Sequence, residues 1–358
     1  MQTFRVELGA NSHSVHIGGG ILADLGKLAR DAGLKPGRSA VVTDSNVANL
    51  YAPGALAALA EAGFAPALVE IPAGEASKSL AQLERLYTAM TDAELDRTSV
   101  VFALGGGVVG DLAGFAASSY LRGIPLVHVP TTLLAQVDSS LGGKTGVNHP
   151  GAKNLIGSFY QPRLVVADVA TLKTLPDREL REGLAEVIKY GAIMDEPMLG
   201  AIEESLDRIL ARDVAALEAI VERSLRHKAS IVAADERESD LRRILNFGHT
   251  IGHALEASAG YGTFLHGEAV AVGMVAALRI SCAHCGLHAD DATRLVKLID
   301  RAGLPTTMPK GWRDKQFERA LRLDKKRTDG AIEFVLLERL GHATTKRLGV
   351  DEALACLS

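Results

Sequence analysis

The segment SVVFALGGGVVGD, residues 99–111, decides the fold class of this chain. Its apolar first half predicts a buried strand, and the glycine-rich remainder predicts a tight turn that opens a helix near Asp111. Glycines at positions 105, 107 and 110 have the spacing and the strand-to-helix setting of a dinucleotide-binding loop. Without β-carbons, such a loop lets backbone amides approach a pyrophosphate, and the helix N-terminus favours the negative charge. A tight turn without a ligand is the alternative.

Alternating strands and helices continue on both sides of this segment. Further short apolar strands are predicted at residues 39–43, 67–71, 126–129 and 164–168. Between the strands the pattern is helical, as at residues 50–62 and 79–93. Short apolar strands separated by helices indicate a parallel sheet that is covered on both faces.

The pattern changes after Pro176, where strand signals almost disappear. Helices are predicted at residues 180–193, 215–234, 241–259, 268–285 and 290–302, and one more strand at 331–337. Pro176 and Asp177 also make a good helix start, so we place a domain boundary there. The predicted fold is an α/β N-terminal Rossmann-like domain with a parallel sheet over residues 1–176, followed by an all-α C-terminal domain over residues 177–358.

The composition narrows the class of protein. A length of 358 residues suggests two domains, and 47% hydrophobic with 23% charged residues is typical of a globular protein. The formal net charge of −4 argues against nucleic acid as a partner. The longest apolar run, residues 269–278, is too short for a membrane span, and the N-terminus lacks a signal-peptide core. We therefore expect a cytoplasmic protein without a membrane partner.

Three cysteines suit a reducing compartment. Cys282 and Cys285 form a Cys-x-x-Cys with His284 and His288 nearby, but no second cysteine pair accompanies them. Because they lie within a continuous helical pattern, we interpret them as structural residues; a redox or zinc role is the alternative.

The glycine-rich loop departs from the standard Rossmann pattern in two ways. It follows the third strand, and no acidic residue ends a strand about twenty residues further on. Asp44, at the end of an earlier predicted strand, is therefore the better candidate for a ribose partner. The polar segment 138–154 contains Lys144 and Lys153 but lacks the first glycine of a phosphate-binding P-loop. Its backbone donors and lysines suit a phosphorylated or carboxylated ligand, although a solvated loop is the alternative.

The segment NFGHTIGH, residues 246–253, suggests a metal site. Asn246, His249 and His253 share one face of the helix predicted there, and His266 follows closely. Two imidazoles one turn apart suit zinc or a similar divalent ion, whereas solvated or capped histidines are the alternative. In the apolar segment 183–191, Glu186 and Lys189 lie three residues apart and either pair with each other or point into a cleft.

Seven ordered segments closely resemble one family, 3-dehydroquinate synthase, a sugar-phosphate cyclase of the shikimate pathway and aromatic amino acid biosynthesis. They are GGGVVGDLAGF, VPTTLLAQVDSSLGGKTGVN, KNLIGSFYQP, GLAEVIKYG, NFGHTIGHALE, LHGEAVAVGM and LDKKR. The resemblance implies a Rossmann-like NAD domain followed by a helical domain, and it also implies a homodimer. It also implies zinc or cobalt bound by Glu186, His249 and His266. His253 then handles a proton and is not a ligand.

The implied reaction converts 3-deoxy-D-arabino-heptulosonate 7-phosphate, a phosphorylated sugar acid, to 3-dehydroquinate and phosphate. It proceeds by transient NAD-dependent oxidation, phosphate elimination, re-reduction and intramolecular aldol closure, which makes the enzyme a carbon–oxygen lyase. The resemblance assigns catalytic roles to His253, Lys189, Asn246 and Lys144. It assigns substrate binding to Arg122, Asp138, Lys144, Asn154, Lys189, Lys228, Arg242, Asn246, His253, Lys325 and Lys326.

The family's NAD-binding positions correspond to Asp44, Glu75, Lys78, Gly106, Gly107, Val108, Val109, Gly110, Asp111, Thr131, Thr132, Asp138, Lys144 and Lys153. Arg122 is expected to reach the neighbouring subunit's site in a dimer. Three alternatives remain: another sugar-phosphate cyclase, a metal-dependent polyol or glycerol-phosphate dehydrogenase, and a non-catalytic binding protein. Arg242 and Asn246 suit a substrate carboxylate and favour the dehydroquinate reaction.

Overall fold

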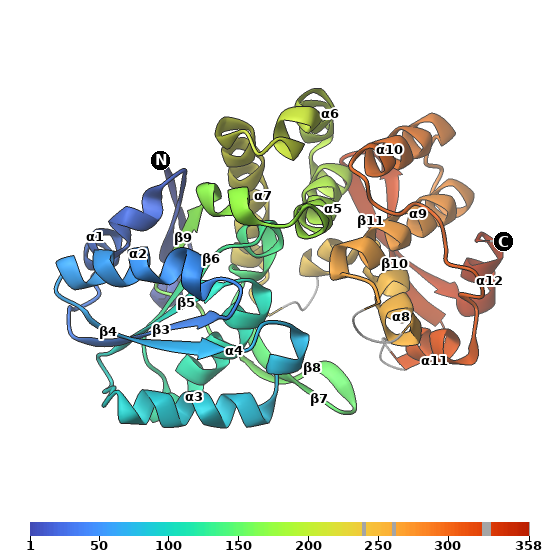
Figure 1. The fold of residues 1–358 in the computed structure, drawn as a ribbon. Helices are drawn as coiled ribbons and strands as arrows, with labels where there is room; N and C mark the ends of the chain where they lie inside the picture. Colours follow the sequence, from blue (N-terminus) through green and yellow to red (C-terminus); the bar gives the residue numbers. More distant parts are fainter. Residues whose placement is uncertain (238–240, 260–262, 324–330, 358) are drawn as a thin grey trace. The chain divides into compact units, whose positions relative to one another are not determined.

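The computed structural model describes residues 1–237, 241–259, 263–323 and 331–357, and the chain forms two compact units (Figure 1). The first unit comprises Met1–Leu175 and Val214–Arg237, and the second comprises Pro176–Asp213 and Glu238–Ser358. Within the described ranges, no helix is both long enough and apolar enough to cross a membrane.

A seven-stranded sheet forms the centre of the first unit (Figure 1). Its strands, in spatial order, are β1 (Gln2–Val6), β2 (His13–Gly18), β9 (Leu164–Asp168), β6 (Leu126–Pro130), β5 (Val100–Gly105), β3 (Arg38–Asp44) and β4 (Ala65–Ile71). All neighbouring strands run parallel except β1 and β2, which are antiparallel. The predicted parallel sheet is confirmed, with predicted strand ends that differ from the observed ones by at most two residues.

Helices cover both faces of this sheet. On one face, α1 (Leu25–Asp31) and α2 (Ala48–Glu61) pack on one set of strand residues, which includes Phe102. On the other face, α3 (Leu80–Asp92) and α4 (Gly107–Ser119) pack on the alternate set, which includes Val101. Side chains alternate between the two faces of a strand, and both faces of this sheet are buried. The sequence of β5 is therefore apolar throughout.

Helix α7 (Val214–Ala234) belongs to the first unit although it lies in the second half of the sequence. The amide of Gly19 donates a hydrogen bond of 2.8 Å to Glu218 Oε1, and the Arg226 guanidinium lies 4.8 Å from the centre of the Phe4 ring. A single boundary near residue 176 therefore does not describe the two units. Apolar periodicity identified this helix, but periodicity does not show which core a helix covers.

The second unit is mainly helical. Its helices are α5 (Asp177–Met194), α6 (Glu196–Leu210), α8 (His249–Ala259), α9 (His266–His284), α10 (Ala289–Arg301), α11 (Lys315–Leu323) and α12 (Val350–Ala355). An antiparallel pair, β10 (Ala331–Arg339) and β11 (His342–Gly349), also belongs to it. The unit is helical as predicted, but the description as all-α is corrected by this hairpin, whose second strand is mostly polar and exposed.

The helix predicted at residues 241–259 is interrupted. Residues Leu241–Asn246 form a 3₁₀ helix, and α8 begins only at His249. Between them Gly248 has a φ of +81°, a backbone conformation that favours glycine and ends the first helix. Asn246 is thus not on the helix that carries His249 and His253, which corrects the prediction that all three share one helical face.

Candidate functional site

The first unit has a topological switch point between β3 and β5. These neighbouring parallel strands are followed by α2 and α4, which pack on opposite faces of the sheet. Asp44 ends β3 and Gly105 ends β5, so both lie at the carboxyl edge of the sheet, where ligands bind in open α/β sheets. The Asp44 Oδ1 accepts hydrogen bonds from the amides of Asn46, at 2.9 Å, and Val47, at 3.2 Å.

The glycine-rich loop opens α4 earlier than predicted, at Gly107 and not near Asp111. A β-carbon on Gly106 would lie 3.0 Å from Thr132 Cγ2, and one on Gly107 would lie 3.2 Å from Ser139 Oγ. The glycines therefore permit a close approach between this loop and the segment after β6. Val109 has no exposed surface, so its side chain belongs to the core and only its backbone is suited to ligand contact.

Several predicted NAD-binding residues gather near the start of α4. Lys78, which is buried, forms an ion pair with Asp111. Burial raises the pKa of Asp111, and the charge of Lys78 opposes this effect. Glu75 Oε1 accepts a hydrogen bond of 2.7 Å from the Asn148 side chain. The amide of Thr131 donates to Gly105 O at 3.0 Å, which joins the segment after β6 to the loop.

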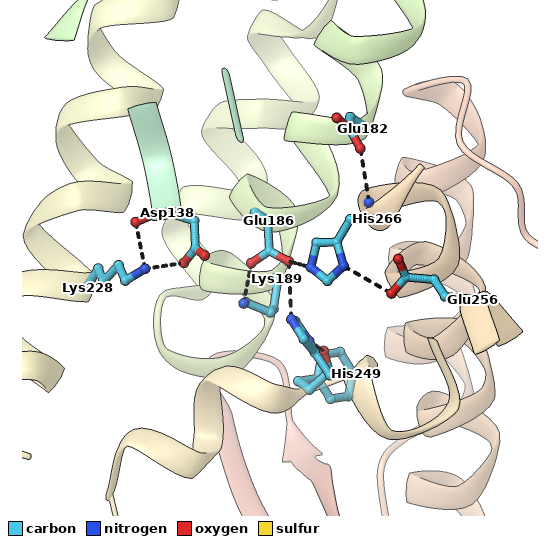
Figure 2. A network of polar contacts seen from close by, with 10 residues as sticks. Asp138, Glu182, Glu186, Lys189, Lys228, His249, Glu256 and His266 are labelled. Atoms are coloured by element: carbon cyan, nitrogen blue, oxygen red, sulfur yellow. Dashed lines mark hydrogen bonds and ion pairs between the residues drawn. The ribbon is translucent and has the colours of Figure 1, made fainter. Parts of the chain in front are cut away.

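Residues Ala135–Ser139, which include the predicted site residue Asp138, form a π-helix. Lys228 Nζ, on α7, donates to Asp138 O at 2.6 Å and to Asp138 Oδ1 at 2.7 Å (Figure 2). The helix α7 thus contributes a buried ammonium group to this unit. Short π-helical segments occur frequently at functional sites.

Lys144, Lys153 and Asn154 lie on a separate two-stranded sheet made of β7 (Lys144–His149) and β8 (Ala152–Phe159). Asn154 has a φ of +53°, and its amide donates a 2.9 Å hydrogen bond to Asn148 Oδ1. Thr132 Oγ1 accepts the amide of Ala135 at 3.2 Å.

In the second unit, Glu186, His249 and His266 converge from α5, α8 and α9 (Figure 2). Glu186 Oε1 lies 3.6 Å from His249 Nε2 and 3.8 Å from His266 Nε2. One possible ligand atom from each of the three residues lies within 4.8 Å of the others. Lys189, one turn further along α5, forms an ion pair with Glu186 Oε2. The structure thus brings together the three residues predicted as metal ligands.

The polar surroundings of this cluster suit a cation. Glu186 has no exposed surface, its Oε2 is paired with Lys189, and its Oε1 accepts no hydrogen bond from the part of the chain that the structure describes. Burial, and then the charge of Lys189, hold the pKa of His249 well below its ordinary value. His249 is therefore neutral near pH 7, and a neutral imidazole is the form that binds metal.

His266 has a different environment. Burial alone would lower the pKa of His266, but its hydrogen bond with Glu256 and the charges of Glu256 and Glu186 outweigh burial and raise the pKa. His253 lies beside both imidazoles, with ring centres 5.2 Å from His249 and 5.9 Å from His266.

Two buried carboxylates near His266 were missed by the sequence analysis. Glu256 Oε2 lies 3.4 Å from His266 Nδ1, and Glu182 Oε2 accepts the amide of Gly267 at 3.3 Å (Figure 2). Burial raises the pKa of Glu182 to about 7, although the Gly267 hydrogen bond opposes the shift. A signal for Glu256 was present, because it lies seven residues after His249 and thus on the same face of α8. Glu182 lies four residues before Glu186, so the spacing likewise puts these two residues on the same face of α5.

The other predicted site residues are Arg242, Arg122, Lys325 and Lys326. Arg242 is buried within the 3₁₀ helix that ends at Asn246. Arg122 ends another 3₁₀ helix, Tyr120–Arg122, with a φ of +69°. Lys325 and Lys326 lie outside the described residues. In the described part of the chain, neither Cys282 nor Cys285 joins a group that could hold a metal, and both thiols are free.

Comparisons with known proteins cover the whole chain. The sequence model of the 3-dehydroquinate synthase N-terminal domain matches residues 68–182, and that of the C-terminal domain matches residues 183–327. The 3-dehydroquinate synthase of Symbiobacterium thermophilum is 56% identical over 94% of both chains. The 3-dehydroquinate synthase of Desulforamulus reducens is 51% identical over 100% of both chains.

Solved structures of related cyclases share the fold. A 2-deoxy-scyllo-inosose synthase complexed with carbaglucose-6-phosphate, NAD⁺ and Co²⁺ has a TM-score of 0.89 and 26% identity over 99% of both chains. The 2-epi-5-epi-valiolone synthase of Streptomyces hygroscopicus, with NAD⁺ and Zn²⁺ bound, has a TM-score of 0.88 and 28% identity, covering 98% of this chain and 96% of its own.

The dehydrogenase and the other cyclases are less similar to this chain than the 3-dehydroquinate synthases are. Glycerol dehydrogenase of Schizosaccharomyces pombe, at 18% identity and a TM-score of 0.69, shares the fold alone. The two other cyclases are 26% and 28% identical, about half the identity of the two full-length relatives above. Matching domain models and these relatives lead to one conclusion: the chain belongs to the 3-dehydroquinate synthase family.

Proposed function

We propose that this protein converts 3-deoxy-D-arabino-heptulosonate 7-phosphate to 3-dehydroquinate and phosphate, as a carbon–oxygen lyase that requires NAD and a divalent metal. The observation that carries the proposal is the convergence of Glu186, His249 and His266 in a chain of this family. The related cyclases with NAD⁺ and with Co²⁺ or Zn²⁺ support the choice of cofactors.

The donor set fits a catalytic zinc or cobalt ion. One carboxylate and two imidazoles are common zinc ligands, and three protein ligands leave positions open for substrate oxygens. The buried Glu186 carboxylate needs a cation beyond Lys189 to satisfy both oxygens, and the Nε2 atoms of both imidazoles face Oε1. When bound, the metal acts as a Lewis acid that stabilises negative charge on a substrate oxygen.

We assign NAD to the switch point of the first unit. Asp44 is suited to the ribose, and the backbone amides of residues 106–110 at the start of α4 are suited to the pyrophosphate. The ion pair between Lys78 and Asp111 fixes the polar groups at the start of α4. When bound, NAD accepts a hydride and returns it. The wider proposed set remains the one predicted from the sequence, including Thr131, Thr132, Asp138, Lys144 and Lys153.

Cationic and proton-handling side chains complete the proposed site. Lys189 and Lys228 are both buried, and each is already held by a carboxylate, so their ammonium groups have fixed positions. The Arg242 guanidinium is suited to bidentate pairing with the substrate carboxylate. His253, whose ring lies beside those of His249 and His266, is proposed to accept a hydroxyl proton in general base catalysis.

A homodimer is the proposed assembly, with Arg122 reaching the neighbouring site. Leu121 and Arg122 both have positive φ, a strained backbone that is often found at functional sites. Leu121 is 41% exposed, and β8 exposes Leu155 at 61% and Phe159 at 49%, so apolar surface is available for a contact between subunits.

Light scattering coupled to size exclusion should give twice the mass of the chain; the mass of one chain would contradict the dimer. Cytoplasmic location stays a prediction.

A phosphate-release assay tests the proposed reaction. The purified protein should release phosphate from the heptulosonate phosphate, and a chelator should abolish the release until Zn²⁺ or Co²⁺ is restored. Glucose 6-phosphate and sedoheptulose 7-phosphate, as substrates of other cyclases, serve as controls. Because NAD is regenerated in each turnover, no net NADH should accumulate. Release only from glucose 6-phosphate, or NADH formed in proportion to product, would contradict the proposal.

A further inference from the structure

We infer that Glu256 is a positioning residue for the metal site: its carboxylate accepts the Nδ1 proton of His266 and so fixes the ring with Nε2 directed at the metal. The inference rests on the proposed metal site of Glu186, His249 and His266. It assigns a function to a buried carboxylate that the proposed reaction does not otherwise use.

The geometry places the two nitrogens of His266 in different environments. Nδ1 lies 3.4 Å from Glu256 Oε2, and Nε2 lies 3.8 Å from Glu186 Oε1. Glu256 is only 7% exposed, so its charge is weakly screened by water. An imidazole that donates one N–H to a carboxylate keeps the other nitrogen as a lone-pair donor and becomes a stronger ligand.

His249 is held in a parallel way by a different acceptor. Its Nδ1 lies 3.2 Å from the carbonyl oxygen of Phe247, and its Nε2 faces Glu186. Both imidazoles thus present Nε2 to the same carboxylate and use Nδ1 for orientation. A carboxylate is a stronger acceptor than a carbonyl group, so His266 should be the more basic of the two ligands.

A second arrangement of the same residues has to be separated from this one. His253, Glu256 and His266 also have possible ligand atoms within 4.8 Å of one another. If a metal bound there, Glu256 would be a ligand of a second ion. The number of bound ions per chain distinguishes the two arrangements, because a positioning residue supports one ion and a second site would hold two.

The experiment measures metal affinity directly. The full-length protein and its Glu256→Gln variant are stripped of metal, and Zn²⁺ affinity is measured by competition with a chromophoric chelator. Loss of this partner should weaken Zn²⁺ binding by about 10- to 100-fold while one ion per chain still binds at saturation. The visible absorption of the Co²⁺-loaded variant should also change, because it reports ligand geometry.

Glu182→Gln is the matched control. Glu182 is another buried carboxylate near His266, but it accepts the backbone amide of Gly267 and not the imidazole. Its affinity and Co²⁺ spectrum should stay close to those of the unsubstituted protein. Should Glu256→Gln not fold, Glu256→Asp provides the test, since it keeps the charge but withdraws the oxygen, and should also weaken binding.

Each outcome decides between the possibilities. Unchanged Zn²⁺ affinity in the Glu256 variant, or equal weakening by Glu182→Gln, overturns the positioning role. Two ions in the unsubstituted protein and one in the variant also overturn it, because Glu256 would then be a ligand. Failure of the proposed function looks different: the unsubstituted protein itself would bind no metal or would stay active in chelator.

Discussion

At the scale of single residues, Glu186 is the central residue of the proposed metal site. A fully buried carboxylate is costly unless cations neutralise it, and Lys189 contacts only one of its oxygens. The second oxygen faces two imidazole nitrogens, which is an arrangement that a divalent ion completes. A bound metal ion would therefore offset the cost of burying the Glu186 carboxylate and would also serve the proposed reaction.

Glu186→Gln should empty the metal site. A neutral amide is a poorer zinc ligand, so Zn²⁺ affinity should fall by more than the roughly 100-fold that loss of an orienting residue costs. Metal analysis of the purified variant checks this. Glu203→Gln, the same substitution at a carboxylate that pairs with Arg294, should keep full occupancy. Full occupancy in the Glu186 variant would remove this residue from the ligand set.

His253→Ala should separate metal binding from turnover. Because His253 is proposed to move a proton and not to bind metal, the variant should retain one ion per chain. Its kcat should fall by roughly 100- to 10,000-fold, the usual contribution of general acid–base catalysis. Steady-state kinetics on metal-loaded protein measure the change, and an unaltered kcat would exclude His253 from proton transfer.

The sequence predicted the residues of this cluster but not their relation. Spacing suggested His249 and His253 as a ligand pair with His266 nearby, and only the family resemblance made Glu186 and His266 ligands in place of His253. Glu256 and Glu182 went unnoticed because a buried acidic residue on an amphipathic helix resembles a solvated one in sequence. Whether such a residue faces a histidine depends on how α5, α8 and α9 pack, which sequence periodicity does not contain.

At the scale of elements, the close packing of α8 against α9 positions His249. Gly248, with positive φ, and Gly273 allow the contact: a β-carbon on Gly273 would lie 1.9 Å from the Gly248 carbonyl oxygen. The sequence predicted helices on either side of this contact. It did not predict the break at Gly248, because a single glycine within a helical pattern is also compatible with a continuous helix.

Gly273→Ala should destabilise the helical unit by about 1–3 kcal/mol or more, because the added methyl group meets backbone atoms that cannot move independently. The shift should also displace His249 and weaken metal binding. Gly200→Ala on α6 is the matched control, since its β-carbon would have only Arg294 Nη2 within 4 Å, at 3.8 Å. That control should be neutral or stabilising by about 0.5–1 kcal/mol. Thermal unfolding compares the two, and equal stability would contradict the packing argument.

At the scale of the whole molecule, a buried histidine in the sheet should make stability depend on pH. Burial, with a smaller effect of His13, lowers the pKa of His128 from 6.5 to about 4. Between pH 4 and 6.5 the unfolded chain binds more protons than the folded chain. The contribution of His128 to the free energy of unfolding is therefore complete above pH 6.5 and is lost as the pH falls towards 4. The sequence placed His128 in a strand, but its depth came only from the helices on both faces.

Lowering the pH from 7.5 to 5 should therefore reduce the free energy of unfolding by about 2 kcal/mol through His128 alone. The Tm of the first unit, measured at both pH values, should fall, and His128→Gln should reduce that fall. His342→Asn, at a half-exposed histidine of β11, controls for general effects of histidine removal. An identical pH dependence in the His128 variant and the unsubstituted protein would contradict this assignment.

The membership of α7 in the first unit has a consequence for synthesis of the protein. The chain leaves the first unit at residue 175, returns to it at residue 214 and leaves it again after residue 237. A nascent polypeptide therefore cannot complete the sheet-containing unit until about two thirds of it has emerged from the ribosome. A fragment that stops at residue 176 would lack Lys228 and expose the surfaces that α7 covers, so the two halves of the gene do not encode two independent proteins.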